Sequence, residues 1–187
     1  ASYGPKIAID VEDALGRQWQ LPTIQVDLTM LPERMQCEYI DADGQPKRPV
    51  VIHRAIFGSY ERFVAILTEH FAGAFPTWLA PVQARVLPIS EKHAEYGRRV
   101  FAALRAARIR AELDDRNEKL GYRVRDAQIR KVPYVLVVGE REAQAGTASL
   151  RRRGGEDVGA VPLERIVAEL TAEIAGRSAT LTVGRAG

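Results

Sequence analysis

The sequence predicts two unlike folded parts, an α+β part with antiparallel strands and one helix, followed by a complete α/β domain. Three observations predict this. Short β-prone runs fill residues 1–52, Pro76 and Pro81 interrupt the chain after a helical segment, and helical and strand periods then alternate to about residue 175. The boundaries are therefore expected at 1–76 and 77–178, with a frayed tail at 179–187.

The first part begins as a run of antiparallel strands joined by turns. Gly16-Arg17 is expected to form a hairpin turn, and Asp41–Gly44 a second turn. The strands are expected at Ile7–Val11, Trp19–Leu21, Thr23–Asp27 and Arg48–Ile52.

A helix is expected directly after these strands. Ser59 can cap it, Glu61 suits the positive end of the helix dipole, and Gly73 offers a left-handed stop. Apolar residues at helical spacing predict its buried face, which consists of Phe63, Val64, Ile66, Leu67 and Phe71.

The second part alternates between buried strands and amphipathic helices, a pattern that specifies a sheet covered by helices. Strands are expected at Val82–Leu87, Ile109–Leu113, Pro133–Val138 and Thr147–Arg152. Three helices are expected. The first is capped by Ser90 and faces inward through Ala94, Gly97, Val100, Phe101 and Leu104. The second, Leu120–Arg130, faces inward through Tyr122, Val124, Ala127 and Ile129, and the third spans Leu163–Ala175.

The composition is that of an ordinary globular protein, with 46% hydrophobic and 27% charged residues among 187 and a formal net charge of +3. With Cys37 as its only cysteine, the chain has no intramolecular disulfide and no cysteine-rich zinc module, which indicates a reducing, cytoplasmic setting. No apolar run is long enough to cross a bilayer, so no membrane association is expected. The missing initiator methionine suggests a chain that starts inside a larger protein.

Two places in the sequence can carry chemistry. Around Ile52–Phe63 a strand end, the turn at Gly58 and a helix start with Arg62 make a natural anion site; the alternative is a capped helix with a surface arginine. In the second part, Lys and Arg outnumber Asp and Glu between Arg98 and Arg153, which fits either a solvated helix face or a phosphate-facing surface. No catalytic constellation is found there, but the loop Asp114–Lys119 and the run Arg151–Arg153 are expected at strand ends.

Those two segments can act as an RNA-reading surface, in which Asn117 and the arginines read base edges while neighbouring positive charge holds the phosphates. Arg152 is the candidate for a contact with the RNA backbone alone. A solvated loop with a stray basic run is the alternative.

Several sequence blocks, in this order, strongly resemble the C-terminal half of threonyl-tRNA synthetases. The resemblance extends to about residue 175 and includes blocks specific to the threonyl enzymes within class II. The blocks are Tyr3–Ile7, Asp13–Arg17, Trp19–Gln20, Thr23–Asp27, Leu31–Arg34, Arg48–Ala55, Gly58–Phe63, Phe75–Gln83, Asp114–Lys119, Gly121–Asp126 and Lys131–Gly139.

The resemblance implies a partial class II antiparallel sheet with the motif 3 helix, followed by a mixed-sheet α/β anticodon-binding domain. It makes Arg62 and Lys6 catalytic, and places Gln20, Thr23, Ser59 and Arg62 at ATP or the adenylate. Threonine would be bound by Tyr3, Gln25 and Ala55. The implied reaction is ATP- and magnesium-dependent activation of threonine and its transfer to threonine tRNA, in an intact enzyme that is a homodimer.

The resemblance also implies a zinc ion that binds threonine, with His53 as one ligand and the other two, a cysteine and a histidine, upstream of Tyr3 and absent here. Motifs 1 and 2 are absent as well. Anticodon recognition falls to Asn117, Arg125, Glu142 and Arg151. We therefore expect the chain alone to bind tRNA weakly and to catalyse nothing.

Two other hypotheses remain. The chain can be a free-standing, synthetase-derived RNA-binding or regulatory module without catalysis. It can also be a structural accessory subunit that uses this fold for protein contacts.

Overall fold

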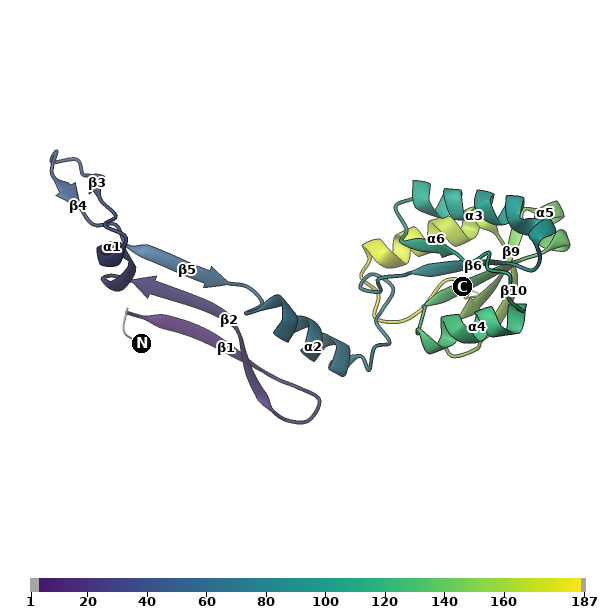
Figure 1. Cartoon of the computed structure of the whole chain (residues 1–187), viewed down its shortest axis with the longest axis horizontal. Helices are drawn as coiled ribbons and strands as arrows, with labels where there is room; N and C mark the ends of the chain where they lie inside the picture. The colour runs from purple at the N-terminus through teal and green to yellow at the C-terminus, as the bar shows by residue number, and fades with distance from the viewer. Residues whose placement is uncertain (1–3, 186–187) are drawn as a thin grey trace. The chain divides into compact units, whose positions relative to one another are not determined.

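The computed structural model describes residues 4–185 and divides after Ala72 into two compact units (Figure 1). The first unit contains a three-stranded and a two-stranded sheet, and the second unit a five-stranded sheet. Among the described residues, no helix is both long and apolar enough to span a membrane.

The first unit is built on an antiparallel sheet of three strands, in the order β1-β2-β5. The segments Trp19–Leu21 and Thr23–Asp27, predicted as two strands, form one continuous strand. The ladder with β1 is irregular between Ala8 and Asp10, opposite Leu21 and Pro22, which accommodates a proline that has no N–H to donate. The elements are β1 (Lys6–Glu12), β2 (Gln18–Asp27), α1 (Met30–Arg34), β3 (Tyr39–Ile40), β4 (Pro46–Lys47), β5 (Val51–Ala55) and α2 (Tyr60–His70).

The predicted buried face of α2 is not buried in this unit. Phe63 and Leu67 are half-buried and Val64 is exposed. The sheet likewise presents large apolar side chains to solvent: Ile7, Ile9, Ile24 and Ile52. Local sequence correctly predicts the helix, but none of its residues is buried in this unit.

The second unit contains a mixed five-stranded sheet in the order β10-β9-β8-β6-β7, which confirms the predicted α/β class. Strands β6, β7 and β8 are mutually parallel, whereas β9 and β10 run antiparallel. The elements are β6 (Ala84–Pro88), the 3₁₀ turn η1 (Glu91–His93), α3 (Ala94–Ala106), β7 (Ala111–Leu113), α4 (Leu120–Ile129), β8 (Tyr134–Val138), α5 (Glu140–Ala145), β9 (Thr147–Arg152), β10 (Asp157–Pro162) and α6 (Leu163–Ala175).

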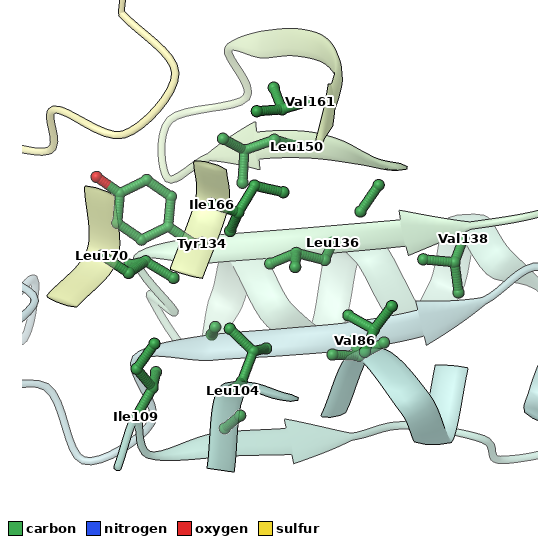
Figure 2. Close-up of a cluster of buried hydrophobic side chains, with 14 of the residues drawn as sticks. Val86, Leu104, Ile109, Tyr134, Leu136, Val138, Leu150, Val161, Ile166 and Leu170 are labelled. Atoms are coloured by element: carbon green, nitrogen blue, oxygen red, sulfur yellow. The ribbon is translucent and has the colours of Figure 1, made fainter. Parts of the chain in front are cut away.

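Helices cover both faces of this sheet. Tyr134, Leu136 and Val138 alternate along β8 toward α3 and α6, where they join the larger core (Figure 2). Val135 and Val137 point to the other face and pack with Ala127 of α4. The dense apolar run of β8 therefore reflects a strand buried on both sides, as parallel strands usually are.

The predicted inward face of α4 needs correction. In α4 the inward residues are Arg123 and Ala127, with Val124 half-buried, whereas Tyr122 and Ile129 are 55% and 68% exposed. Arg123 and Ala127, four residues apart, lie on one side of the helix, whereas Tyr122 and Ile129, seven residues apart, lie on another side, away from the sheet.

Ser90 does not cap a helix through its side chain; its Oγ lies 3.0 Å from Nδ1 of His93. Strand β10 and the short helix α5 were not predicted, because glycines interrupt the strand pattern and a six-residue polar helix has no apolar period.

The tail was expected to fray from residue 179, and this is wrong for the described residues. Val183 is completely buried in the core, and Gly184 donates its N–H to Glu169. Thr182 donates both its N–H and its hydroxyl to Oε2 of Glu173, at 2.6 and 2.7 Å.

Glu173 is a buried carboxylate, 5% exposed, that joins three distant segments. Besides Thr182, it accepts from Thr77 Oγ1 at 2.5 Å and from the Tyr134 hydroxyl at 2.7 Å. Burial, together with the neighbouring Glu173 carboxylate, raises the pKa of Tyr134, which keeps this hydroxyl a donor. The tail is ordered because a buried acceptor must collect donors to offset its lost hydration.

Glu173→Ala should lower the free energy of unfolding of this unit by about 3 kcal/mol or more, because it leaves several buried donors unpaired. Urea denaturation followed by far-UV circular dichroism measures this change. Glu164→Ala, at an exposed site on the same helix, should cost less than about 1 kcal/mol. Equal losses in the two variants would contradict the structural role given to Glu173.

Candidate functional site

Several predicted pocket residues share one face of the first sheet. Lys6 pairs with Gln25, and Gln25 pairs with His53 on the other side; Thr23 pairs with Ala55. Because directly opposed residues of an antiparallel ladder project to the same face, these side chains line one surface. Tyr3, predicted to join them, lies outside the described residues.

Arg62 is held beside this face at the start of α2. Its Nη1 donates to the Gln20 carbonyl oxygen at 3.1 Å, and its guanidinium carbon lies 5.7 Å from the Trp19 ring centroid. Lys6 Nζ donates to Gln20 Oε1 at 3.0 Å, so Gln20 links the two cations. Ser59 Oγ accepts from the Arg62 N–H and caps the helix, as predicted. The structure thus brings Lys6, Gln20, Ser59 and Arg62 together.

Gly58 makes this arrangement possible. Its φ is +70°, and a Cβ there would lie 3.2 Å from the Leu21 carbonyl oxygen. The turn therefore requires both the left-handed conformation and the close approach that glycine allows.

Trp19 and Asp13 support Arg62 and were not predicted as part of the site. Asp13 accepts from Trp19 Nε1 at 2.7 Å and Arg17 Nε at 2.6 Å. Burial raises the pKa of Asp13, but the hydrogen bonds from Trp19 and Arg17 outweigh it and hold the pKa well below its usual range. This carboxylate fixes the ring on which Arg62 lies. In the sequence, the one local indication of this support is that Asp13 directly precedes the turn at Gly16, where aspartate side chains often accept backbone N–H groups.

His53 does not complete a metal site with the residues described. Its Nε2 lies 3.8 Å from Asp27 Oδ2, and the buried Asp27 carboxylate already accepts the N–H groups of Thr29, Met30 and Leu31. Within residues 4–185 no three His, Cys, Asp or Glu side chains are grouped to hold a metal. Zinc sites in proteins use at least three protein ligands, and His53 can supply one such ligand. Among the described residues it therefore does not form a zinc site with its neighbours.

In the second unit, Asn117 and Glu142 lie at one edge of the sheet. Asn117 follows β7 and Glu142 follows β8. Both strands run parallel to β6, which lies between them, so their carboxyl ends lie at the same edge of the sheet. Asn117 is exposed and lines a groove of about 740 Å³. Glu142 is half-buried and accepts the N–H of Gly139 at 2.9 Å, which caps α5.

Arg125 and Arg151 lie away from that edge. Arg125 is exposed on α4. Arg151 was expected in a strand-end loop, but it lies within β9, opposite Val135 near the start of β8. Its Nη2 donates to Asp157 at 3.0 Å. Val135 packs toward α4, so both arginines belong to the α4 side of the sheet.

Arg152, expected to contact the RNA backbone, is only 6% exposed. Its Nε donates to the Val183 carbonyl oxygen at 2.9 Å and its Nη1 to Glu156 at 2.6 Å. The alternation of β9 turns Arg152 into the core and Arg151 away from it. Arg152 therefore anchors the tail.

The loop that carries Asn117 is tied to α4 by ion pairs. Arg116 donates to both oxygens of Asp114, at 2.8 and 2.7 Å, and to Asp126 at 3.0 Å. Hydrogen bonding from Arg116 holds the pKa of Asp114 below its usual range.

Comparison with known proteins gives both units a counterpart. Residues 1–71 match the family described as tRNA synthetase class II core domain (G, H, P, S and T), and residues 83–173 match the family described as anticodon binding domain. These two domains define part of a class II aminoacyl-tRNA synthetase.

The individual relatives narrow this class. A threonine–tRNA ligase of Caldanaerobacter subterraneus subsp. tengcongensis is 56% identical over 95% of this chain, and one of Symbiobacterium thermophilum is 53% identical over 95%. The RNA-binding domain of threonyl-tRNA synthetase from Cryptosporidium parvum Iowa II superposes with a TM-score of 0.74 at 39% identity, over 92% of this chain and 43% of that one. The chain belongs to the threonine–tRNA ligase family, and it spans 28% and 27% of the two ligases' lengths.

Asp114→Asn should destabilise the second unit by about 1–2 kcal/mol near neutral pH, because it removes a charge-assisted pair from Arg116. The folded-state pKa of Asp114 is lowered, so its contribution is present above the usual aspartate pKa and is lost as pH falls through the folded value. The difference between parent and variant should therefore shrink below about pH 4. Urea denaturation at several pH values tests this; a difference that stays constant down to about pH 2 would contradict it.

Proposed function

We propose that this chain is the part of a threonine–tRNA ligase that contributes to the ATP and threonine pocket through its first unit and recognises threonine tRNA through its second. The observation that carries the proposal is the cluster of Arg62, Gln20 and Lys6 at the start of α2, within the segment that matches the class II core. The family relationship supplies the substrates.

The chemistry of threonine activation suits this cluster. The threonine carboxylate attacks the α-phosphorus of ATP, the bond from that phosphorus to the oxygen bridging it to the β-phosphorus breaks, and pyrophosphate leaves with the bonding electrons. Negative charge increases on the phosphoryl oxygens in the transition state. A guanidinium already oriented by the Gln20 carbonyl and the Trp19 ring stabilises that charge without reorganising. Lys6 adds a second cation, and Thr23 and Ser59 complete the adenylate contacts. Magnesium would arrive with ATP and offset its phosphate charge.

Threonine itself would lie on the face shared by Gln25, Ala55 and His53, with Tyr3 as a further contact. In this proposal His53 supplies one ligand of a zinc ion whose other protein ligands are outside this chain. A metal that binds the substrate hydroxyl discriminates against valine, which has none to offer.

Anticodon recognition is assigned to Asn117, Arg125, Glu142 and Arg151. The match to an anticodon-binding domain and the exposure of Asn117 and Arg125 support this assignment. The complete protein would act as a homodimer in the cytoplasm.

A free-standing RNA-binding module is the second candidate. It is favoured by the closed core of the second unit. The sequence upstream of Ala1 in the gene discriminates: motifs 1 and 2 with a Cys and a His support the ligase.

Asn117→Ala should reduce anticodon discrimination while leaving most of the affinity, because phosphate contacts supply much of tRNA binding. We expect the preference for threonine tRNA over the same tRNA with one changed anticodon base to fall by about tenfold. Fluorescence anisotropy at fixed salt measures both affinities. Arg105→Ala, on α3 and away from the groove, is the control; an unchanged preference in Asn117→Ala would contradict the assignment.

Arg62→Lys should lower ATP–pyrophosphate exchange by about 100-fold or more in a full-length ligase that carries this segment, because lysine keeps the charge but loses the oriented fork. Arg54→Ala is the control, since Arg54 neighbours His53 in β5 and so projects to the opposite face. The 187-residue chain itself should show no exchange. Full activity of Arg62→Lys would contradict its role, and exchange by the isolated chain would contradict its dependence on further domains.

A further inference from the structure

Arg123 of α4 is a buried arginine that grips the loop bearing Asn117. It is 3% exposed, and its Nη1 donates to the Asp114 carbonyl oxygen at 2.7 Å. Its Nε donates to the Glu118 carbonyl oxygen at 3.1 Å. These two carbonyls bracket the loop, so one guanidinium holds both of its ends.

The same guanidinium also reaches the neighbouring strand. Its Nη2 donates to the carbonyl oxygen of Pro88, the last residue of β6, at 2.7 Å. The loop after β7 is thereby tied to the end of β6 and to α4 by a single planar group. Lysine cannot reproduce three bonds in these fixed directions, because its ammonium is a point donor on a flexible stem.

Arg123, Pro88 and Asn117 line the same groove of about 740 Å³. The hydrogen bonds of Arg123 therefore hold together the two segments, the end of β6 and the loop after β7, that line the groove beside Asn117. Asn117 itself is exposed, and its position depends on the loop ends that Arg123 holds.

We propose that Arg123 is a positioning residue for anticodon recognition, which acts by fixing the Asn117 loop against β6, and that the base contacted by Asn117 enters this groove. The proposal rests on the function assigned above to Asn117. Because direct base readout requires hydrogen-bond geometry accurate to a few tenths of an ångström, a loosened loop loses discrimination before it loses phosphate-driven affinity.

The test compares Arg123→Lys and Arg123→Gln with Arg110→Lys in the 187-residue chain. Arg110 also donates to backbone carbonyls, those of Trp78 and Ala80, but it holds a segment that does not line the groove. The readout is the ratio of affinities for threonine tRNA and for the same tRNA with one changed anticodon base. Circular dichroism sets a temperature at which every variant is folded.

We expect the ratio to fall about tenfold in both Arg123 variants and to stay unchanged in Arg110→Lys. The double variant Asn117→Ala/Arg123→Lys should match Asn117→Ala alone, since Arg123 acts through Asn117. An unchanged ratio in the Arg123 variants, or a loss that adds to that of Asn117→Ala, would overturn the proposal. A parent chain that does not distinguish the two tRNAs would instead overturn the proposed function.

Discussion

Glu173 brings together the segment that enters β6, the start of β8 and the tail that follows α6, because its carboxylate accepts hydrogen bonds from Thr77, Tyr134 and Thr182. A carboxylate this far from solvent is tolerated only when its oxygens are satisfied. The three segments must therefore converge for the second unit to fold. The tail seals the core with Val183 as a consequence, and the sheet becomes a rigid frame for the loops at its edge.

On that frame, the polar residues assigned to RNA binding occupy different kinds of place. Asn117 and Glu142 follow parallel strands at one edge, whereas Arg125 and Arg151 lie on the α4 side of the sheet. A single-stranded anticodon loop, whose bases can be splayed apart, can contact both places at once. Buried arginines supply the support: Arg123 holds the loop before α4 and Arg152 holds the tail.

Much of this architecture is predictable from local pattern, and the exceptions share a cause. The strand Thr147–Arg152 and the helix Leu163–Ala175 have the predicted bounds because period and burial agree. The tail and Arg152 were misjudged because their environment is set by distant residues such as Glu173 and Val183. Tyr122 was misjudged because Arg123, which bonds to Pro88 of β6, takes the inward side of α4. In the first unit, Arg62 and Ser59 are predictable from the turn and helix start, but the Asp13–Trp19 support is not, because it depends on a contact made only after the hairpin closes.

We propose that the second unit reads an anticodon with the edge that carries Asn117 and with the α4 side of its sheet. The most direct measurement is a backbone amide NMR titration of the chain with the anticodon stem-loop of threonine tRNA. Shifts should concentrate at residues 114–118 and at Arg125, Glu142 and Arg151. Shifts confined to α3 and α6, on the opposite face of the sheet, would contradict the claim.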